Sequence, residues 1–239
     1  MHDTIKRLVP ASARILLREA LGRRAYAIRS YAQEGEDLLL LRMFSDTRSG
    51  VYVDVGAHHP FRFSNTQLLH ERGWRGINID ARPGSMENFR RFRPLDANLE
   101  IGISGARIRL VYHVFAEPAL NTFDAELARV RLSQGWKQVC TQTIDCYPLA
   151  EILAREVPKL GTRSIDLLSV DVEGLDLEVL RSNDWQRFRP RAIVAEILGT
   201  DVASMSDSEV TRFLGSVGYR PYAKLVNSAI FLRNDPDTA

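Results

Sequence analysis

The chain has 239 residues, of which 45% are hydrophobic and 26% charged, and its formal net charge is +2. This length suits one domain, or one domain with an appendage, and the composition is that of an ordinary globular protein. No apolar run approaches the ~18 residues of a membrane span, and the first 30 residues lack the apolar stretch and cleavage site of a secretory signal. The two cysteines, Cys140 and Cys146, have no metal-type spacing, which favours a reduced, cytoplasmic setting.

The first 30 residues form a basic segment. They carry seven Lys/Arg and two acidic residues, a local net charge of +5, which leaves −3 for the rest of the chain. Apolar residues recur there at roughly helical spacing, so we predict an amphipathic helix over 1–30 ahead of a single domain over 31–239. Such a helix can pack on the domain, lie on an anionic membrane or dock a partner. Nucleic-acid binding is not expected, because the basic surface is small and lacks stacking aromatics, and no feature indicates an oligomeric state.

Helices and strands are predicted to alternate from residue 33 onward. The expected helices are 33–45, 64–73, 84–92, 123–133, 148–156, 176–182 and 207–217. The expected strands are 50–56, 75–83, 98–104, 137–145, 165–174 and 191–198, with 107–115 as an added antiparallel strand. Two short strands around 224–227 are close enough to form a hairpin. This order predicts an α/β fold with a mostly parallel twisted sheet, helices on both faces and a C-terminal antiparallel hairpin.

Polar residues follow successive predicted strands at the point where each strand ends. In an open α/β sheet, ligands bind at the carboxyl ends of the strands. A single acid there is often only a turn residue, but the repetition favours a binding site. These residues are Asp54 with Gly56, Asp80, Ser104, Asp171 with Glu173, and Glu196.

The turn after the first strand indicates what the site binds. Gly56 lets the backbone come close to a ligand, but the sequence DVGAHHP lacks the further glycines or lysine of a phosphate-binding loop. That argues against NAD and ATP. Asp80 ends the second strand about 25 residues later, where an acid accepts hydrogen bonds from ribose hydroxyls. A cofactor with a ribose, no phosphate and a positive charge fits these acids, and S-adenosylmethionine has these properties.

Several longer stretches, in order, carry a resemblance to a known family. They are SYAQEGEDLLL, GVYVDVGAHHPFRFSNT, RGWRGINIDARPGSMENF, NLEIGIS, ALNTFD and IDLLSVDVEGLDLEVLRSNDW. Over roughly 31–232 the chain resembles the FkbM family of S-adenosylmethionine-dependent methyltransferases. The resemblance implies a Rossmann-like methyltransferase fold and O-methylation, commonly of sugar or polyketide hydroxyls.

The resemblance also implies cofactor contacts at particular positions. The glycine motif falls on Asp54, Gly56 and Ala57. The ribose acid falls on Asp80. The remaining expected contacts are Ala81 and Arg82 beside the adenosine, Ser104 at the adenine, and Gln33 and Glu34 over the methionine end. An acidic helix start such as Glu34 is also explained by the helix dipole.

The acids at the last two strand ends are candidates for a metal site. Methyl transfer to an alcohol requires alignment of the oxygen and removal of its proton. Asp171, Glu173 and Glu196 would supply the oxygen ligands that Mg²⁺ or Mn²⁺ prefers, and the cation would make the hydroxyl more acidic. The alternatives are that one of these carboxylates, Asp171 in particular, is the base, or that Glu173 only caps the following helix.

Histidines and a polar loop supply the remaining candidates. His58 and His59 follow the first strand and could take the proton of the acceptor hydroxyl, with His59 preferred because Pro60 restrains its backbone. His113 lies on the inserted strand. Residues 117–124 are expected to form a lid in which Asn121 and Thr122 bind sugar hydroxyls.

The leading hypothesis is an O-methyltransferase acting on a sugar of a bacterial surface glycan or its precursor. The alternatives are methylation of a small secondary metabolite and a non-catalytic binding module that keeps the fold. The retained acids oppose the second alternative. An NAD-dependent oxidoreductase is disfavoured because the glycine pattern is incomplete.

Overall fold

The computed structural model describes residue 22 and residues 26–234. The chain divides into two units, Met1–Ser30 and Tyr31–Ala239, and the fold below is that of the second. The helix predicted over 1–30 lies almost entirely outside the described residues. Among the described helices, none has both the length and the apolar character that crossing a membrane requires.

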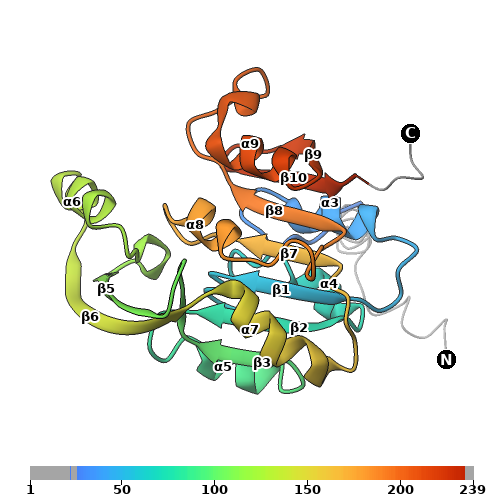
Figure 1. The fold of residues 1–239 in the computed structure, drawn as a ribbon, viewed down its shortest axis with the longest axis horizontal. Coiled ribbons are helices and arrows are strands. Elements are labelled where there is room, and N and C mark those ends of the chain that lie inside the picture. The colour runs from blue at the N-terminus through green and yellow to red at the C-terminus, as the bar shows by residue number, and fades with distance from the viewer. Residues whose placement is uncertain (1–21, 23–25, 235–239) are drawn as a thin grey trace, which may run out of the picture. The chain divides into compact units, whose positions relative to one another are not determined.

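A seven-stranded sheet forms the centre of the second unit (Figure 1). Its strands, in spatial order, are β3 (Ala97–Glu100), β2 (Arg75–Asp80), β1 (Val51–Val55), β7 (Leu167–Val170), β8 (Ala192–Glu196), β10 (Ser228–Arg233) and β9 (Tyr219–Lys224). All neighbours pair in parallel except β10, which pairs antiparallel with both β8 and β9. The predicted parallel sheet with a C-terminal antiparallel hairpin is therefore confirmed, and the fold is a Rossmann-like methyltransferase fold.

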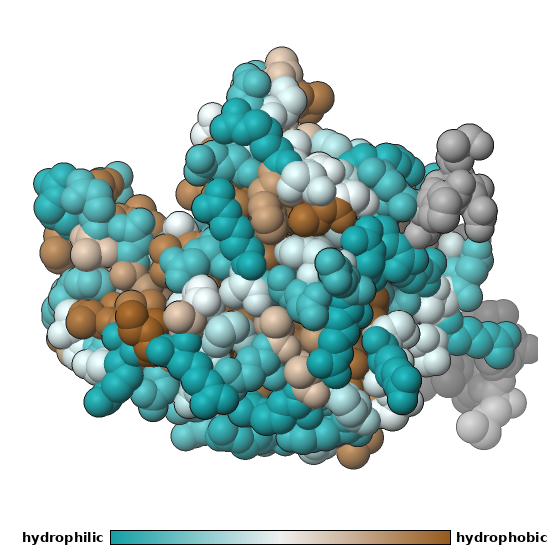
Figure 2. Space-filling view, viewed as in Figure 1, coloured by the Kyte–Doolittle hydropathy of each residue, from teal (hydrophilic) through white to brown (hydrophobic). Residues whose placement is uncertain are grey.

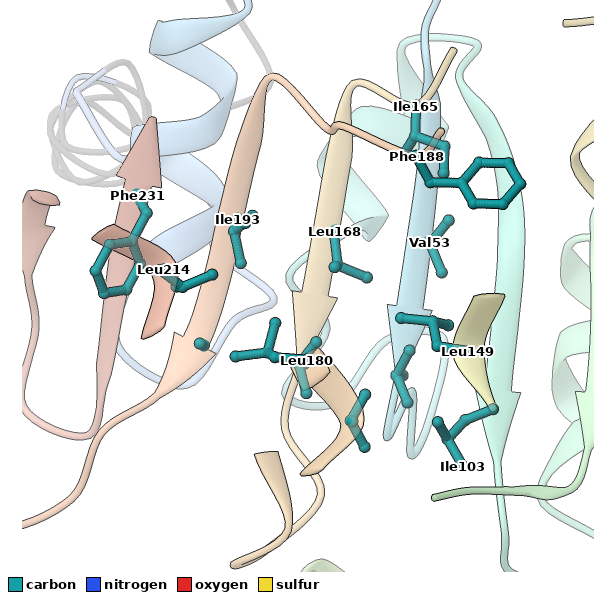
Figure 3. Packing of buried hydrophobic residues seen from close by; sticks show 14 of the residues in the cluster. Val53, Ile103, Leu149, Ile165, Leu168, Leu180, Phe188, Ile193, Leu214 and Phe231 are labelled. Atoms are coloured by element: carbon teal, nitrogen blue, oxygen red, sulfur yellow. The ribbon is translucent and has the colours of Figure 1, made fainter. Parts of the chain in front are cut away.

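Helices cover both faces of this sheet and therefore bury its strands on both sides. The helices are α3 (Glu36–Met43), α4 (Gln67–Glu71), α5 (Met86–Phe92), α7 (Leu149–Glu156), α8 (Asp176–Arg181) and α9 (Glu209–Ser216). Successive residues of β1 point to opposite faces. Val53 packs in one core with Leu149 of α7 and Leu214 of α9, whereas Tyr52 packs in a second core with Leu40 of α3. Figure 3 shows the first core, with side chains from β1, β7, β8 and β10 meeting those of the helices.

A second, three-stranded sheet was not predicted. The stretch 107–115 was expected to be an added antiparallel strand, and β5 (Ile108–Phe115) does pair antiparallel, with the long β6 (Gln138–Tyr147), which also pairs with β4 (Gly102–Ile103). The predicted strand 98–104 is consequently split between the two sheets. Together with α6 (Ala125–Ser133), β5 and β6 form an arm that projects from the main sheet (Figure 1).

Short 3-10 helices complete the connections at Pro118–Leu120, Val157–Leu160 and Met205–Asp207. The first belongs to the arm, and the third lies in the long segment between β8 and α9. The space-filling view shows a deep notch between the arm and that segment (Figure 2). The arm follows Ser104 at the end of β4, and the other segment follows Glu196 at the end of β8.

Candidate functional site

A pocket opens at the carboxyl ends of β1, β2 and β7, where the strand order reverses. This is the position at which open α/β sheets bind ligands. Its empty volume is about 780 Å³, which includes the open space at its mouth. Residues from four parts of the chain line it: Val55, Gly56, His58 and Phe63 after β1; Ile79, Asp80 and Ala81 at β2; Ile101, Gly102 and Ile103 at β4; and Asp171, Val172, Glu173 and Leu175 after β7. The arm supplies Tyr112, Pro118, Ala119, Asn121 and Phe123, and Gln33 completes the lining.

Gly56 is required by the close approach of two strands. Its φ is +83°, and a Cβ built there would lie 1.7 Å from the carbonyl oxygen of Asp171. The amides of Gly56 and Ala57 both donate to the carbonyl of Ile79, at 2.9 and 3.0 Å. No side chain fits at this turn, so the backbones of β1, β2 and β7 meet below the pocket.

Asp54 and Ala57, the two other residues of the predicted glycine motif, stabilise the turn without lining the pocket. Asp54 is buried and accepts a 2.7 Å hydrogen bond from the Thr66 hydroxyl, and burial raises the pKa of its carboxyl. Ala57 packs against Met86 and Phe89 of α5. Neither residue is part of the pocket lining, so both act on a ligand only through the backbone that they hold.

Asp80 lies in the pocket wall and fixes two loops. Its Oδ2 accepts the backbone N–H of His58 at 2.9 Å, and its Oδ1 accepts that of Arg82 at 2.8 Å. Burial raises the pKa of Asp80, and these two hydrogen bonds oppose the rise by stabilising the carboxylate. Each oxygen retains a lone pair for a ligand hydroxyl. Ala81 lines the pocket as predicted, whereas Arg82 contributes its backbone amide and is not part of the lining.

Ser104 is outside the pocket lining, contrary to the expected adenine contact. Its side chain is buried, and its hydroxyl donates to the carbonyl of Ala106 at 2.7 Å. The structure instead brings Ile101, Gly102 and Ile103 to this part of the pocket. These residues offer an apolar wall, and the alternation of the sequence NLEIGIS could have indicated it.

The two histidines have different environments, and the preference for His59 as base is not supported. The Nδ1 of His59 accepts backbone N–H groups from Phe61 at 3.1 Å and Arg62 at 3.2 Å. In the neutral ring the other nitrogen then carries the proton, so no lone pair remains to accept one. His58 does line the pocket, with a φ of +54°, but burial lowers its pKa to about 4, which makes it a weak base.

Asp171, Glu173 and Glu196 come together as the sequence predicts. One carboxylate oxygen from each residue lies within 4.8 Å of those of the other two. Burial and the neighbouring carboxylates raise the pKa of Asp171 well above its usual value and that of Glu196 to about 10. Glu173 also forms an ion pair with the buried Arg131 of α6, which opposes the rise that burial causes in its pKa. The three carboxyls therefore cannot all be ionised at neutral pH without a further cation, because Arg131 pairs only with Glu173.

A second cavity adjoins the first at this cluster. Gln33, Phe63, Asp171 and Glu173 line both cavities. The second is completed by residues that are mostly polar: Glu34, Glu36, Asn65, Val170, Val194, Glu196, Leu198, Asn227 and Ser228. Asp171 keeps contact with solvent because it stands between the two cavities, although protein surrounds it on most sides.

Glu34 belongs to this second cavity rather than to the first. Both of its carboxylate oxygens accept the backbone N–H of Asn227 at 3.0 Å, so it ties the start of α3 to the turn between β9 and β10. Of the two residues expected to cover the methionine end of a cofactor, only Gln33 reaches the first pocket.

The predicted lid is part of the arm, but only one of its two predicted sugar-binding residues lines the pocket. Asn121 lines the first pocket. Thr122 is buried, donating to the carbonyl of Glu173 at 2.8 Å and accepting the amide of Asp124 at 2.9 Å, so its hydroxyl is used within the protein. The ring of His113 faces Gln138 at 3.2 Å, and His113 is not part of the lining. The structure therefore does not support a direct contact of Thr122 or His113 with a ligand.

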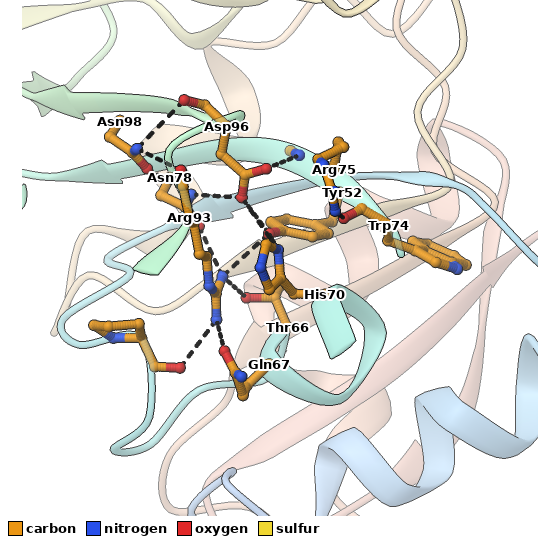
Figure 4. A network of polar contacts seen from close by, with 12 residues as sticks. Tyr52, Thr66, Gln67, His70, Trp74, Arg75, Asn78, Arg93, Asp96 and Asn98 are labelled. Atoms are coloured by element: carbon orange, nitrogen blue, oxygen red, sulfur yellow. Dashed lines mark hydrogen bonds and ion pairs between the residues drawn. The ribbon is translucent and has the colours of Figure 1, made fainter. Parts of the chain in front are cut away.

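A buried arginine that the sequence analysis missed holds the loop after β1. Arg93 is 0% exposed and donates to six acceptors, among them Tyr52, Thr66, Gln67 and Asn78, which Figure 4 shows around it. They are the side chains of Tyr52, Ser64, Thr66, Gln67 and Asn78 and the carbonyl of Pro60, at 2.9–3.2 Å. Thr66 in turn donates to Asp54, so the arginine acts on the pocket through two hydrogen bonds. Nothing in the sequence RRFRPL distinguishes this arginine from its exposed neighbours.

Comparisons with known proteins identify the family of the chain. Residues 54–221 match the family model described as the methyltransferase FkbM domain. A solved structure from Pyrococcus horikoshii, named as a "putative RNA methyltransferase", is 11% identical, with a TM-score of 0.38 and 83% of each chain covered. No curated protein sequence matches the chain.

Proposed function

The chain belongs to the FkbM methyltransferase family, and from this we propose that it transfers a methyl group from S-adenosylmethionine to a hydroxyl of a sugar. The acceptor we propose is a sugar of a bacterial surface glycan or its precursor. S-adenosylmethionine is the usual methyl donor of such enzymes. The observation that carries the proposal is the pair of adjoining cavities, one suited to a nucleoside and the other to a polar acceptor, which meet at Asp171.

The first pocket supplies the groups that an adenosine needs. The Asp80 carboxylate accepts hydrogen bonds from the ribose hydroxyls, and the apolar wall of Ile101 and Ile103 contacts the adenine. At the opposite wall the side chains of Asp171 and Glu173 favour the positive charge of a sulfonium. Among the described residues that line this pocket there is no lysine or arginine to pair with the phosphates of a dinucleotide cofactor.

The second cavity supports a polyhydroxylated acceptor. Carboxylates and the side-chain amide of Asn65 surround it, and these groups accept and donate the hydrogen bonds that sugar hydroxyls make. An acceptor held there presents a hydroxyl at Asp171, beside the methionine end of the cofactor pocket. In-line transfer requires the acceptor oxygen to face the methyl carbon from the side opposite the sulfur, so the two ligands must meet at Asp171.

Asp171 is the group we propose to receive the hydroxyl proton. Asp171 stands where the two cavities meet, whereas His58 has a pKa of about 4 and the lone pair of the neutral His59 ring already accepts two backbone amides. This replaces the sequence-based preference for the histidine.

A divalent cation fits the same carboxylates. Asp171, Glu173 and Glu196 present three oxygens within 4.8 Å of one another, and their mutual repulsion would be relieved by Mg²⁺ or Mn²⁺. When bound, such an ion lowers the pKa of a coordinated hydroxyl. Without it, Arg131 is the cation that lies against the cluster. The ion pair of Glu173 leaves Asp171 and Glu196 as the principal ligands of such a cation.

Two measurements test the proposal. Calorimetry should show binding of S-adenosylhomocysteine and no binding of NAD. Incubation with S-adenosylmethionine and a panel of glycans, nucleotide sugars and small hydroxylated metabolites should then give products heavier by one methyl group. Absence of S-adenosylhomocysteine binding would contradict the proposed cofactor, and methylation confined to non-sugar metabolites would contradict the proposed acceptor.

A further inference from the structure

The side-chain amide of Asn121 has a spare N–H donor in the wall of the first pocket. The residue is 5% exposed, and its Nδ2 has no acceptor at ordinary hydrogen-bond geometry among the described residues; the Tyr112 hydroxyl beside it can engage only one of its two N–H groups. Its Oδ1 accepts the backbone N–H of Phe115 at 2.7 Å. Because a backbone N–H can only donate, the oxygen must face Phe115, which fixes the orientation of the amide. A buried polar group without a partner is unfavourable unless a ligand supplies one.

The surroundings of Asn121 place it at the nucleoside end of the pocket. Tyr112 and Asp80 line the same pocket as Asn121, and a side-chain hydrogen bond from Asn121 opposes the rise that burial causes in the pKa of Tyr112. The rings of Tyr112 and Phe123 are 4.6 Å apart between centroids. A Cβ built on Gly102 would lie 2.9 Å from Phe123, so this ring reaches the apolar wall of β4. Asn121 therefore lines the pocket beside Tyr112, which Phe123 connects to the apolar wall.

The segment around Asn121 is held on both sides. Before it, Glu117 accepts the amide of Ala119 at 3.2 Å and the guanidinium of Arg62 at 3.0 Å. After it, Thr122 donates to the carbonyl of Glu173 at 2.8 Å. A donor fixed in this way can select one acceptor position on a rigid ligand, because it cannot shift to follow another.

We propose that Asn121 Nδ2 donates a hydrogen bond to a ring nitrogen of the purine in the bound cofactor. This rests on the proposed function, because it assumes that the pocket holds the adenosine of S-adenosylmethionine. Asp80 is an acceptor and serves the ribose hydroxyls, which are donors, so a protein donor is left for the base. The purine ring nitrogens are acceptors in the plane of the ring. Asn121 then serves the cofactor rather than the acceptor sugar to which the sequence analysis assigned it.

The test removes each partner of this hydrogen bond in turn. Calorimetry would compare S-adenosylhomocysteine with its 1-deaza, 3-deaza and 7-deaza analogues, each of which replaces one ring nitrogen by C–H. The wild type should bind one analogue about tenfold more weakly than the parent compound. In Asn121→Ala that particular loss should disappear, although the overall affinity falls. Because only ratios between ligands are compared, partial destabilisation of the variant does not affect the result.

Asn183→Ala is the matched control. Asn183 is similarly buried but lies after α8, where its amide donates to the carbonyl of Phe188 at 3.0 Å, and it does not line the pocket. This variant should keep the wild-type ratios. The inference is overturned if all three analogues bind the wild type like the parent compound, or if the same loss persists in Asn121→Ala. If the wild type does not bind S-adenosylhomocysteine at all, the proposed function fails with it, which is a distinguishable result.

Discussion

Asp80 combines a structural and a binding role at one carboxylate. Its oxygens accept the backbone amides of His58 and Arg82, which orders the loops after β1 and β2. The remaining lone pairs face the pocket that we assign to the ribose. Binding and loop order therefore depend on the same side chain, and a test of Asp80 has to separate the two.

Asp80→Ala should weaken binding of S-adenosylhomocysteine by about 1.5–3 kcal/mol, because the ribose hydroxyls lose a charged acceptor. Calorimetry measures this change. Asp184→Ala is the matched control, since Asp184 also accepts two backbone amides, those of Gln186 and Arg187, but lies outside the pocket. Unchanged affinity in Asp80→Ala would remove this residue from the ribose site.

His58 predicts a pH dependence of stability. Burial lowers its pKa from 6.5 to about 4, so the folded protein holds the ring neutral while the unfolded chain protonates it. The stability linked to this group is present above about pH 6.5 and is lost as the pH falls toward 4. Between pH 7 and pH 4, wild type should lose up to about 3 kcal/mol more unfolding free energy than His58→Gln. Urea denaturation at several pH values measures the difference, and parallel pH profiles would contradict it.

At the scale of elements, the ends of β7 and β8 bring the acidic cluster together. Parallel neighbours end at the same edge of a sheet, so Asp171, Glu173 and Glu196 are close although 25 residues of chain separate the first from the last. The arm adds Arg131 from a third element. The cluster is thus a product of strand pairing and of the insertion that precedes β7.

EDTA should abolish methyl transfer, and Mg²⁺ or Mn²⁺ should restore it, if a cation bridges these strand ends. Asp171→Asn should lower turnover by at least about 10²–10³-fold, because both the cation ligand and the base are lost. Its affinity for S-adenosylhomocysteine should change much less. Glu178→Gln, on the exposed side of α8, should behave like wild type in both assays. Full activity in EDTA would end the metal proposal and leave Asp171 as a base alone.

Arg93 links α5 to the loop that carries His58. It satisfies six acceptors from within the core, and a lysine cannot reach them all because it lacks the planar fork of donors. Arg93→Lys should therefore cost about 3–5 kcal/mol of unfolding free energy in urea denaturation. Arg90→Lys, an exposed position on the same helix, should cost less than about 0.5 kcal/mol. A loss as small as that of the control would show that the network is not needed for stability.

At the scale of the whole molecule, the described fold begins after Ser30. Tyr31 is tied to the second unit by its amide, which donates to Asp37 at 2.6 Å, and by its hydroxyl, which donates to Glu71 at 2.7 Å. The residues of the pocket all follow it in the chain. The described residues of the site thus all belong to the second unit.

Deletion of residues 1–28 should leave the affinity for S-adenosylhomocysteine and the secondary structure unchanged. Calorimetry and circular dichroism measure both. If the segment binds an anionic membrane or a partner, flotation with anionic vesicles or assembly should be lost in the shortened protein. Aggregation of the shortened protein would indicate instead that the segment packs as a structural helix.

The sequence by itself determined the alternation of elements and the edge at which the polar residues lie. Period-two strands with buried apolar faces and glycine-bearing turns are local features, so the sheet, its hairpin, Gly56 and Asp80 could be predicted. The pairing of neighbouring parallel strands then required Asp171, Glu173 and Glu196 to meet. These inferences needed only local periodicity and the rule that parallel strands end together.

Only the tertiary structure decided which side chains reach the cavity. Ser104 and Thr122 form hydrogen bonds within the protein, and His59 accepts two backbone amides. Arg93 is buried by contacts with residues 15 to 41 positions earlier in the chain. The orientation of a side chain depends on hydrogen-bond partners brought together by folding, and these partners leave no periodic signal in the sequence. The second sheet was not predicted either, because β5 pairs with β6, which follows it in the chain only after α6.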